Sequence, residues 1–126
     1  MNTIRFSNLN LSNDEVLLDV GCGEGRHSIG AFIETQVNIL GLDLSIKDLN
    51  IAKDRLNNFE TSGIDAVCQF GAADIVTLPL GDSTLDAVIC SEVLEHVDSP
   101  QESIEELIRV LKPGGVMALS VPRFMP

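Results

Sequence analysis

The segment LLDVGCGEG at residues 17–25 constrains the fold of this chain most strongly. An apolar run leads into Asp19 and then into Gly21, Gly23 and Gly25, so that glycines occupy alternate positions. Glycine adopts positive φ values freely and lets a ligand approach the main chain closely. A buried strand followed by such a turn is typical of open α/β sheets, which bind small ligands at the carboxyl ends of their strands. The segment therefore predicts an α/β fold with a ligand site at this loop.

The spacing of the glycines argues against a phosphate-binding loop. The dinucleotide fingerprint is G-x-G-x-x-G, whereas this chain has G-x-G-x-G. Asp19 precedes the loop and Glu24 lies inside it, so a bound pyrophosphate would meet negative charge. A P-loop requires Lys and then Ser or Thr after the last glycine, and Arg26-His27 stands there instead. Both phosphate-binding interpretations are therefore disfavoured.

A ligand with positive charge suits an acidic loop better, because Asp19 can pair with that charge. S-adenosylmethionine carries an ammonium and a sulfonium group and no phosphate. The segment LLDVGCGEG resembles motif I of the class I S-adenosylmethionine-dependent methyltransferases. The resemblance continues in the family's order over about residues 14–122, through GLDLS at 41–45, AAD at 72–74, LDAVICSEVLEHV at 85–97 and LKPGGVMALSVP at 111–122. Within it, EVLEHV is similar to the segment in small-molecule, type 11-like members such as those of quinone biosynthesis.

Strand and helix signals alternate along the chain. Short apolar runs predict strands at 16–20, 38–43, 66–70, 85–90 and 116–121. Helical spacing predicts helices at 26–36 and 46–59, the second capped by Ser45. Ser99, Pro100 and Glu102 form a capping-box pattern that starts a third helix. Short crossovers imply a three-layer α/β fold, with an open, mainly parallel sheet and helices on both faces, and the resemblance implies the strand order 3-2-1-4-5.

The resemblance also shows which family elements the sequence lacks. The family's sheet has seven strands, with an antiparallel hairpin after the fifth, whereas this sequence stops at Pro126. The fifth strand would then form a bare apolar edge that invites pairing with another chain. We therefore expect either a fragment that is truncated after the fifth strand or a homodimer in which a second copy covers this edge.

The composition limits the classes of partner. With 126 residues and 44% hydrophobic content, the chain can bury one core. We expect a single domain over residues 1–126, in which 1–13 form an irregular amino-terminal extension. The formal net charge of -11 repels nucleic-acid backbones and anionic membranes. We therefore expect no nucleic-acid or membrane partner. Small molecules or proteins are the favoured substrates, and we expect a small-molecule acceptor.

The cysteines and the amino terminus bear on location. Cys22, Cys68 and Cys90 are odd in number and form no C-x-x-C pair, which indicates a reducing compartment and argues against disulfides or a zinc site. The amino-terminal segment MNTIRFSN has no apolar core of a signal peptide, and no apolar run reaches the length of a membrane span. We expect a soluble cytoplasmic protein.

The resemblance assigns the methionine end of the ligand to the first loop. Asp19 would hold the methionyl ammonium through a water molecule or the loop backbone. The methionine portion would lie against Gly21, Cys22, Gly23 and Gly25. For Cys22 the alternative is a small buried residue beside the sheet.

The adenosine end is assigned to the second and third strands. Asp43 ends the second strand, where its carboxylate could accept both ribose hydroxyls; the alternative is an ordinary cap or strand-end acid. Leu44 would lie against the adenine face. Asp74 would accept from the adenine amino group, with Ala73 and Ile75 in apolar contact; the alternative is an aspartate that only caps a turn.

The end of the fourth strand is assigned to the reacting groups. Cys90 and Ser91, followed by Glu92, are expected to face the sulfonium and the acceptor. Family members that methylate planar amino groups carry Asn or Asp, two prolines and an aromatic residue here, and CSEV departs from that motif. Methylation of adenine bases and of glutamine amides is therefore disfavoured.

Two histidines need separate interpretation. His96 is the candidate general base, because its ordinary pKa is near 6.5 and it closely follows the fourth strand. The alternative is a histidine that pairs with an acid and orders the loop before Ser99. Glu92 and His96 lack a third ligand, so we expect no metal. We expect His27 to be a partly exposed surface residue.

Three classes of function remain open. The first is a methyltransferase that uses S-adenosylmethionine to methylate an oxygen, nitrogen or carbon atom of an acceptor. The second is a module that binds S-adenosylmethionine but has no acceptor pocket of its own. The third is a different Rossmann-like nucleotide-binding protein.

Overall fold

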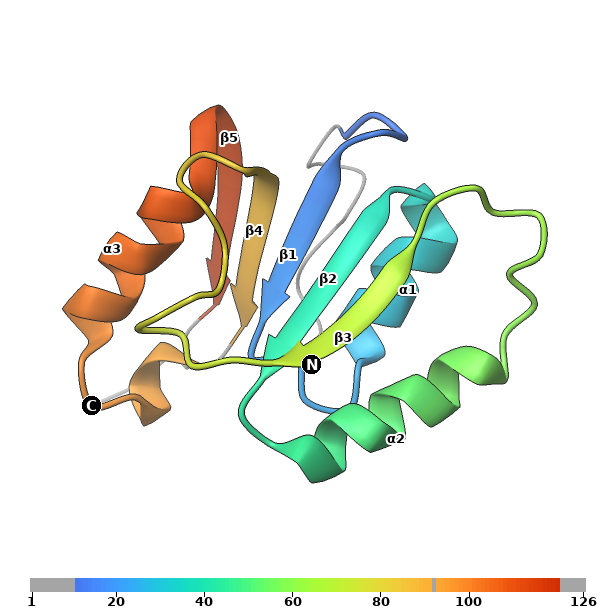
Figure 1. The fold of residues 1–126 in the computed structure, drawn as a ribbon, viewed down its shortest axis with the longest axis horizontal. Helices are drawn as coiled ribbons and strands as arrows, with labels where there is room; N and C mark the ends of the chain where they lie inside the picture. Colours follow the sequence, from blue (N-terminus) through green and yellow to red (C-terminus); the bar gives the residue numbers. More distant parts are fainter. Residues whose placement is uncertain (1–10, 92, 121–126) are drawn as a thin grey trace, which may run out of the picture.

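A computed structural model describes residues 11–91 and 93–120 of the chain. Five strands form one sheet: β1 (Val16–Val20), β2 (Asn38–Asp43), β3 (Cys68–Ala72), β4 (Leu85–Ser91) and β5 (Leu111–Ser120). The helices are α1 (Arg26–Thr35), α2 (Ile46–Asn57), α3 (Pro100–Val110) and the short 3-10 helix η2 (Leu94–His96). The strand order is β3-β2-β1-β4-β5, and every ladder is parallel (Figure 1). The α/β class and the strand order predicted above are confirmed.

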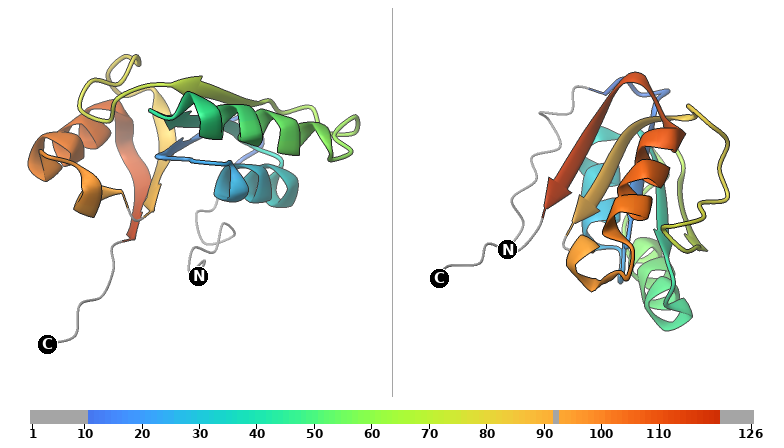
Figure 2. Two further views of the ribbon diagram at one scale, coloured as in Figure 1. Left: turned by 90° about the horizontal axis from the view of Figure 1, so that it is seen from below. Right: turned by 90° about the vertical axis from the view of Figure 1, so that its left-hand side faces the viewer.

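The core lies on both faces of the central strand β1, because neighbouring residues of a strand point to opposite sides. Leu18 belongs to a cluster that α3 covers with Leu107 and Val110. Leu17 belongs to a second cluster that α1 covers with Phe32. Figure 2 shows α1 and α3 on opposite sides of the strands. Because β1 pairs with β2 and with β4 in parallel, the carboxyl ends of these three strands lie at one edge of the sheet.

The helix starts follow the predicted signals in part. Ser45 caps α2, and its Oγ accepts the N–H of Asp48 at 3.2 Å. Pro100 begins α3 as expected, but the Ser99 hydroxyl makes no cap hydrogen bond. Ser99 has φ -127 and ψ 74, and its carbonyl accepts both the N–H and the hydroxyl of Ser103. The predicted capping box is therefore wrong, although the helix begins at the predicted residue.

Two strand ranges differ from the prediction. The β3 ladder begins with Cys68 opposite Ile39, because the Val67 N–H donates to the Asn38 side chain instead. It extends to Ala72 because β2 offers pairing as far as Asp43. The predicted range of 66–70 is thus two residues early.

The strand β5 starts earlier than the predicted residue 116. Leu111 pairs with Leu85 directly after α3, and pairing resumes with Val116 opposite Ala87 beyond an irregularity in the register. Gly114, which lies between these two pairings, has a φ of +82. The predicted end at 121 lies outside the described residues. At the edge of the sheet, Val116 and Leu119 are 40% and 45% exposed.

The connection between β3 and β4 contains no long helix, as the sequence predicts. Arg109 of α3 holds it in place with hydrogen bonds to the Leu78 carbonyl and the Asp82 carboxylate. Glu106 accepts the Leu78 N–H at 2.7 Å and also pairs with Arg109.

No described helix has the length and apolarity that a bilayer-spanning segment needs.

Candidate functional site

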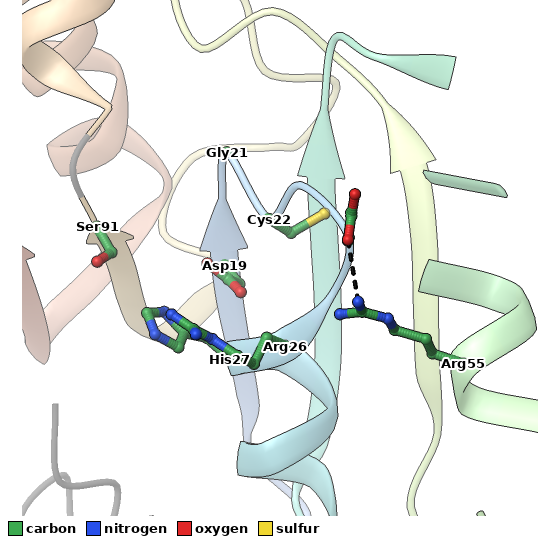
Figure 3. A pocket seen from close by; sticks show the side chains of 8 residues that line it. Asp19, Gly21, Cys22, Arg26, His27, Arg55 and Ser91 are labelled. Carbon is green, nitrogen blue, oxygen red and sulfur yellow. Dashed lines mark ion pairs between the residues drawn. The ribbon is translucent and has the colours of Figure 1, made fainter. Parts of the chain in front are cut away.

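Two cavities open at the carboxyl edge of the sheet and meet at Gly21, which lines both. The first, here named the polar cavity, has a volume of about 390 Å³ and is lined by Asp19, Gly21, Cys22, Glu24, Arg26, His27, Arg55 and Ser91 (Figure 3). The second, the apolar cavity, has a volume of about 250 Å³ and is lined by Val20, Gly21, Asp43, Leu44, Ala73, Asp74, Ile75, Val93, His96 and Val97. The structure thus brings together most residues predicted for the site.

The loop between β1 and α1 depends on its glycines. Gly21, Gly23 and Gly25 have φ values of +73, +54 and +86, which L side chains rarely adopt. A Cβ at Gly21 would also collide with the Val93 side chain, whereas one at Gly23 would meet nothing within 4 Å. Gly21 therefore keeps the junction of the two cavities open, and Gly23 is required by its backbone conformation alone.

Four main-chain N–H groups of this loop are engaged by the protein. Gly21 and Cys22 both donate to the Leu42 carbonyl, at 2.7 and 3.0 Å. Gly23 donates to the Asp43 carboxylate, and Gly25 donates to the Cys22 carbonyl. A phosphate-binding loop must direct such donors at its ligand. This arrangement supports a ligand without phosphate.

Asp19 provides a buried acid at the base of the polar cavity. Its side chain is 2% exposed, and its Oδ2 accepts the Ser28 hydroxyl at 2.7 Å. Burial raises the pKa of Asp19 to about 6, the Ser28 hydrogen bond lowers it, and the negative charge of Asp43 raises it. A cation in the cavity would stabilise the ionised form. The site is therefore built to gain from a positively charged ligand.

Asp43 serves the loop as well as the apolar cavity. Its Oδ2 accepts the Gly23 N–H at 2.7 Å, and its Oδ1 accepts the Ser45 N–H at 2.8 Å. Each carboxylate oxygen has two lone pairs, so these bonds leave acceptor capacity for the predicted ribose hydroxyls. Asp43 therefore combines the strand-end role that the sequence left open with a place in the ligand cavity.

The apolar cavity contains the residues that the sequence predicts for adenine contact. Leu44 is 68% exposed, which leaves its side chain available for stacking. Ala73 and Ile75 line the same cavity. Asp74 also lines it, and its Oδ1 accepts the Val76 N–H at 3.2 Å, so one of its oxygens closes a turn.

The two histidines occupy different cavities. His96 lines the apolar cavity with Asp43 and Asp74, whereas Ser91 lines the polar cavity. His27 is partly exposed as expected, but it also lines the polar cavity. Figure 3 shows His27, Asp19 and Ser91 converging from α1, β1 and β4. The usable signal for His27 was its position one residue after the start of a helix that follows the glycine loop.

The cysteines are not reactive groups in this site. Burial raises the pKa of Cys22 to about 12, and the negative charges of Asp19 and Asp43 raise it as well. The thiol of Cys22 therefore stays protonated beside the polar cavity. Cys90 is fully buried in the core and lines neither cavity. Glu92 lies outside the described residues, and among those that are described no three acids, histidines or cysteines gather as a metal site.

Sequence reasoning did not identify the cations of the polar cavity or the serine beneath it. Arg26 and Arg55 both line this cavity, and Arg55 forms an ion pair with Glu24 at 3.0 Å. The two paired side chains are each 46% exposed, so water screens their attraction. With Asp19, the polar cavity presents both signs of charge, which matches the ammonium and carboxylate of an amino acid.

Comparison with known proteins agrees with this geometry. Residues 18–119 match the model of a family described as "Methyltransferase domain". The chain is 30% identical over 115 residues to a methyltransferase named GfsG from Streptomyces halstedii, covering 91% of this chain and 40% of that protein. It is 38% identical over 104 residues to a ubiquinone biosynthesis O-methyltransferase from Dechloromonas aromatica, covering 82% of this chain and 43% of that protein. The chain therefore spans less than half the length of these relatives.

Solved structures show the same fold. The [4+2]-cyclase SpnF superposes with a TM-score of 0.81 at 30% identity, covering 90% of this chain and 41% of that one. A geranyl diphosphate methyltransferase in complex with SAM superposes with a TM-score of 0.74 at 24% identity, covering 87% and 43%. Because the family match extends over most of the chain, this protein belongs to the methyltransferase domain family.

Proposed function

We propose that the chain is the S-adenosylmethionine-binding core of a methyltransferase that acts on an oxygen, nitrogen or carbon atom of a small-molecule acceptor. The observation that carries the proposal is the meeting of the polar and apolar cavities at Gly21. One cavity offers charges of both signs for an amino acid, and the other offers an acid and apolar side chains for a nucleoside. The ligand joins those two parts through a sulfonium, which would lie near the junction.

Each end of the ligand has partners in the described residues. Asp19 would accept from the ammonium, and Arg26 would attract the carboxylate of the methionyl group. Asp43 would accept from the ribose hydroxyls, while Leu44 covers the adenine and Asp74 accepts from its amino group. These assignments use opposite charge and hydrogen-bonding capacity, and none of them needs a phosphate.

When bound, S-adenosylmethionine supplies a methyl group whose bond to sulfur breaks, with the electron pair, as an acceptor lone pair attacks the carbon. Such a displacement is accelerated mainly by holding the reacting atoms in line. Ser91 and His27 line the cavity where the acceptor would approach. An oxygen or nitrogen acceptor also loses a proton, and the proposed base His96 would take it up.

Two experiments test this function in sequence. Calorimetric titration with S-adenosylmethionine and, separately, with NAD tests the ligand, and binding of NAD alone would reject it. Transfer of a labelled methyl group to a panel of phenols, amines and activated carbon acids then tests the activity. Transfer above the rate without protein supports a complete enzyme.

The second candidate is a module that binds the methyl donor without an acceptor pocket of its own. The favouring observation is that the proposed ligand would fill both the polar and the apolar cavity, while the chain spans 40% of its Streptomyces relative. Tight binding of S-adenosylmethionine without transfer to any acceptor of the panel would select this candidate.

The edge strand supports a further part of the proposal, a homodimer. Val116 and Leu119 of β5 are exposed at the edge of the sheet, where unpaired N–H and C=O groups favour strand pairing. Sedimentation equilibrium of the wild type and of Leu119→Lys tests this arrangement. A monomeric wild type would remove it. The three free cysteines support a reducing compartment such as the cytoplasm.

A further inference from the structure

A buried serine lies directly beneath the polar cavity. Ser28 on α1 is 1% exposed and does not line the cavity, but its hydroxyl donates to Asp19 Oδ2 at 2.7 Å. Polar groups are buried at a cost unless they are paired. This hydrogen bond links α1 to the acid of β1, and it joins a helix to the residue proposed to bind the ammonium.

The neighbouring strand leaves room for this hydroxyl. Gly41 on β2 is the residue opposite Asp19 in the β1–β2 ladder. A Cβ at Gly41 would lie 2.9 Å from Ser28 Oγ and 2.7 Å from Cδ1 of Phe70. A larger residue there would displace the serine or the ring, so Asp19, Gly41 and Ser28 form one packed unit from three elements.

The surroundings of Asp19 disfavour its ionised form, and the Ser28 hydrogen bond opposes that effect. Burial and the carboxylate of Asp43 both disfavour its ionised form, and the Ser28 hydrogen bond favours it. The thiols of Cys22 and Cys68 have raised pKa values and stay neutral. The other charged or imidazole side chains that line the polar cavity with Asp19 are Glu24, Arg26, His27 and Arg55, and Glu24 forms an ion pair with Arg55.

We propose that Ser28 is a positioning residue for methyl-donor recognition: its hydroxyl fixes one oxygen of Asp19 and favours the charged carboxylate, which presents the other oxygen to the ligand ammonium. The proposal rests on the function proposed above. It assigns to Ser28 an effect on the amino-acid end of the ligand only, because the nucleoside end lies in the other cavity.

Calorimetry with two probes tests this assignment. S-adenosylhomocysteine carries the ammonium, whereas methylthioadenosine has the same nucleoside without it. In Ser28→Ala, the affinity for S-adenosylhomocysteine should fall about tenfold near neutral pH, the effect of losing a hydrogen bond to a charged group. It should recover at alkaline pH, where Asp19 ionises unaided. Affinity for methylthioadenosine should not change.

The chain offers a matched control. Ser103 is also fully buried, and its hydroxyl donates to the Ser99 carbonyl on α3, away from both cavities. Ser103→Ala removes the same atom from an equally buried place, so loss of stability alone would appear in both variants. Only Ser28→Ala should change the pH dependence of S-adenosylhomocysteine binding.

Titration of the Asp19 side-chain carboxyl by carbon NMR in the ligand-free protein provides a readout that does not depend on binding. Its midpoint should rise in Ser28→Ala and stay in place in Ser103→Ala. If Ser28→Ala does not fold, Ser28→Cys replaces the hydroxyl with a thiol, which is a weaker hydrogen-bond donor on a side chain of similar size. The midpoint of Asp19 in this variant should lie above that of the wild type. A folded variant with an unchanged midpoint would overturn the proposal.

The two failures are distinguishable. If the wild type binds neither probe at any pH, the proposed function is wrong, and an unchanged midpoint in Ser28→Ala would independently remove the serine's role. If the wild type binds both probes and Ser28→Ala binds them with the same pH profile, the function stands and the inference about Ser28 is wrong.

Discussion

The carboxylate of Asp43, at the end of β2, accepts the N–H of Gly23 in the loop after β1, with 2.7 Å between Oδ2 and the nitrogen. One acid therefore shapes the glycine loop and also lines the cavity proposed for the nucleoside. If the proposed ligand touches both features, a single side chain would couple loop geometry to ribose recognition.

Replacing Asp43 should weaken binding of the proposed ligand in two ways. Asp43→Ala removes the ribose acceptor and the Gly23 bond, and we expect a loss of about 1–3 kcal/mol in S-adenosylmethionine binding. Calorimetry measures the loss, and circular dichroism checks the fold. Asp65→Ala removes the same charge from an exposed position and should bind as the wild type does. Equal affinity in a folded Asp43→Ala would take Asp43 out of the site.

The loop glycines should differ from each other when changed to alanine. Gly23→Ala meets no atom within 4 Å, so it carries only the strain of its positive φ, about 1–2 kcal/mol. Gly21→Ala adds a collision with Val93 and should destabilise more. Gly63→Ala, where the added atom is also free, provides the control. Chemical denaturation measures all three, and equal losses at Gly21 and Gly23 would contradict the collision.

Asp19 should make the free protein less stable as pH rises. Its folded pKa of about 6 lies above the ordinary 3.8, so it contributes stability that is present below about 3.8 and lost as pH rises through about 6. The free energy of unfolding of Asp19→Asn should therefore exceed that of the wild type by about 1–3 kcal/mol near neutral pH. The variant should also lose affinity for S-adenosylhomocysteine. Urea unfolding across pH measures the gain. A wild type and variant with parallel pH profiles would show that Asp19 is not perturbed.

Arg109 should control the order of the loop that supplies Asp74 to the apolar cavity. Arg109→Lys loses the fork that joins the Leu78 carbonyl and the Asp82 carboxylate. Hydrogen exchange of the Leu78 amide should accelerate, while amides of β1 serve as internal references. Methylthioadenosine should also bind less tightly. Unchanged exchange at Leu78 would mean that Glu106, which accepts that N–H, holds the loop alone.

The two histidines should affect different ends of the ligand. His96→Ala should weaken the binding of methylthioadenosine, since His96 lines the apolar cavity. His27→Ala should weaken the binding of S-adenosylhomocysteine and leave the binding of methylthioadenosine unchanged, since His27 lines the polar cavity. If His96 acts as the base, its variant should also lose kcat. Loss of affinity without loss of kcat would assign His96 to binding only.

Local patterns were sufficient for much of this protein. The order of strands and helices follows from apolar runs and from helix-start signals such as Ser45, and these act within a few residues. The alternate glycines determine the loop through backbone sterics, and the acid at the end of β2 is positioned by strand length. The lack of a pyrophosphate fingerprint follows from spacing alone. The strand order came from the family resemblance, since pairing partners are not encoded in periodicity.

Only the tertiary structure decided which distant residues meet. The Ser28 hydroxyl donates a hydrogen bond to Asp19 because α1 packs over β1 at the position opposite Gly41. No sequence motif joins these three positions. His96 lines the apolar cavity because η2 follows β4 toward that cavity. Sequence determines what a segment prefers locally, whereas the partner of a buried polar group depends on packing between elements, where a shift of one helix changes every contact.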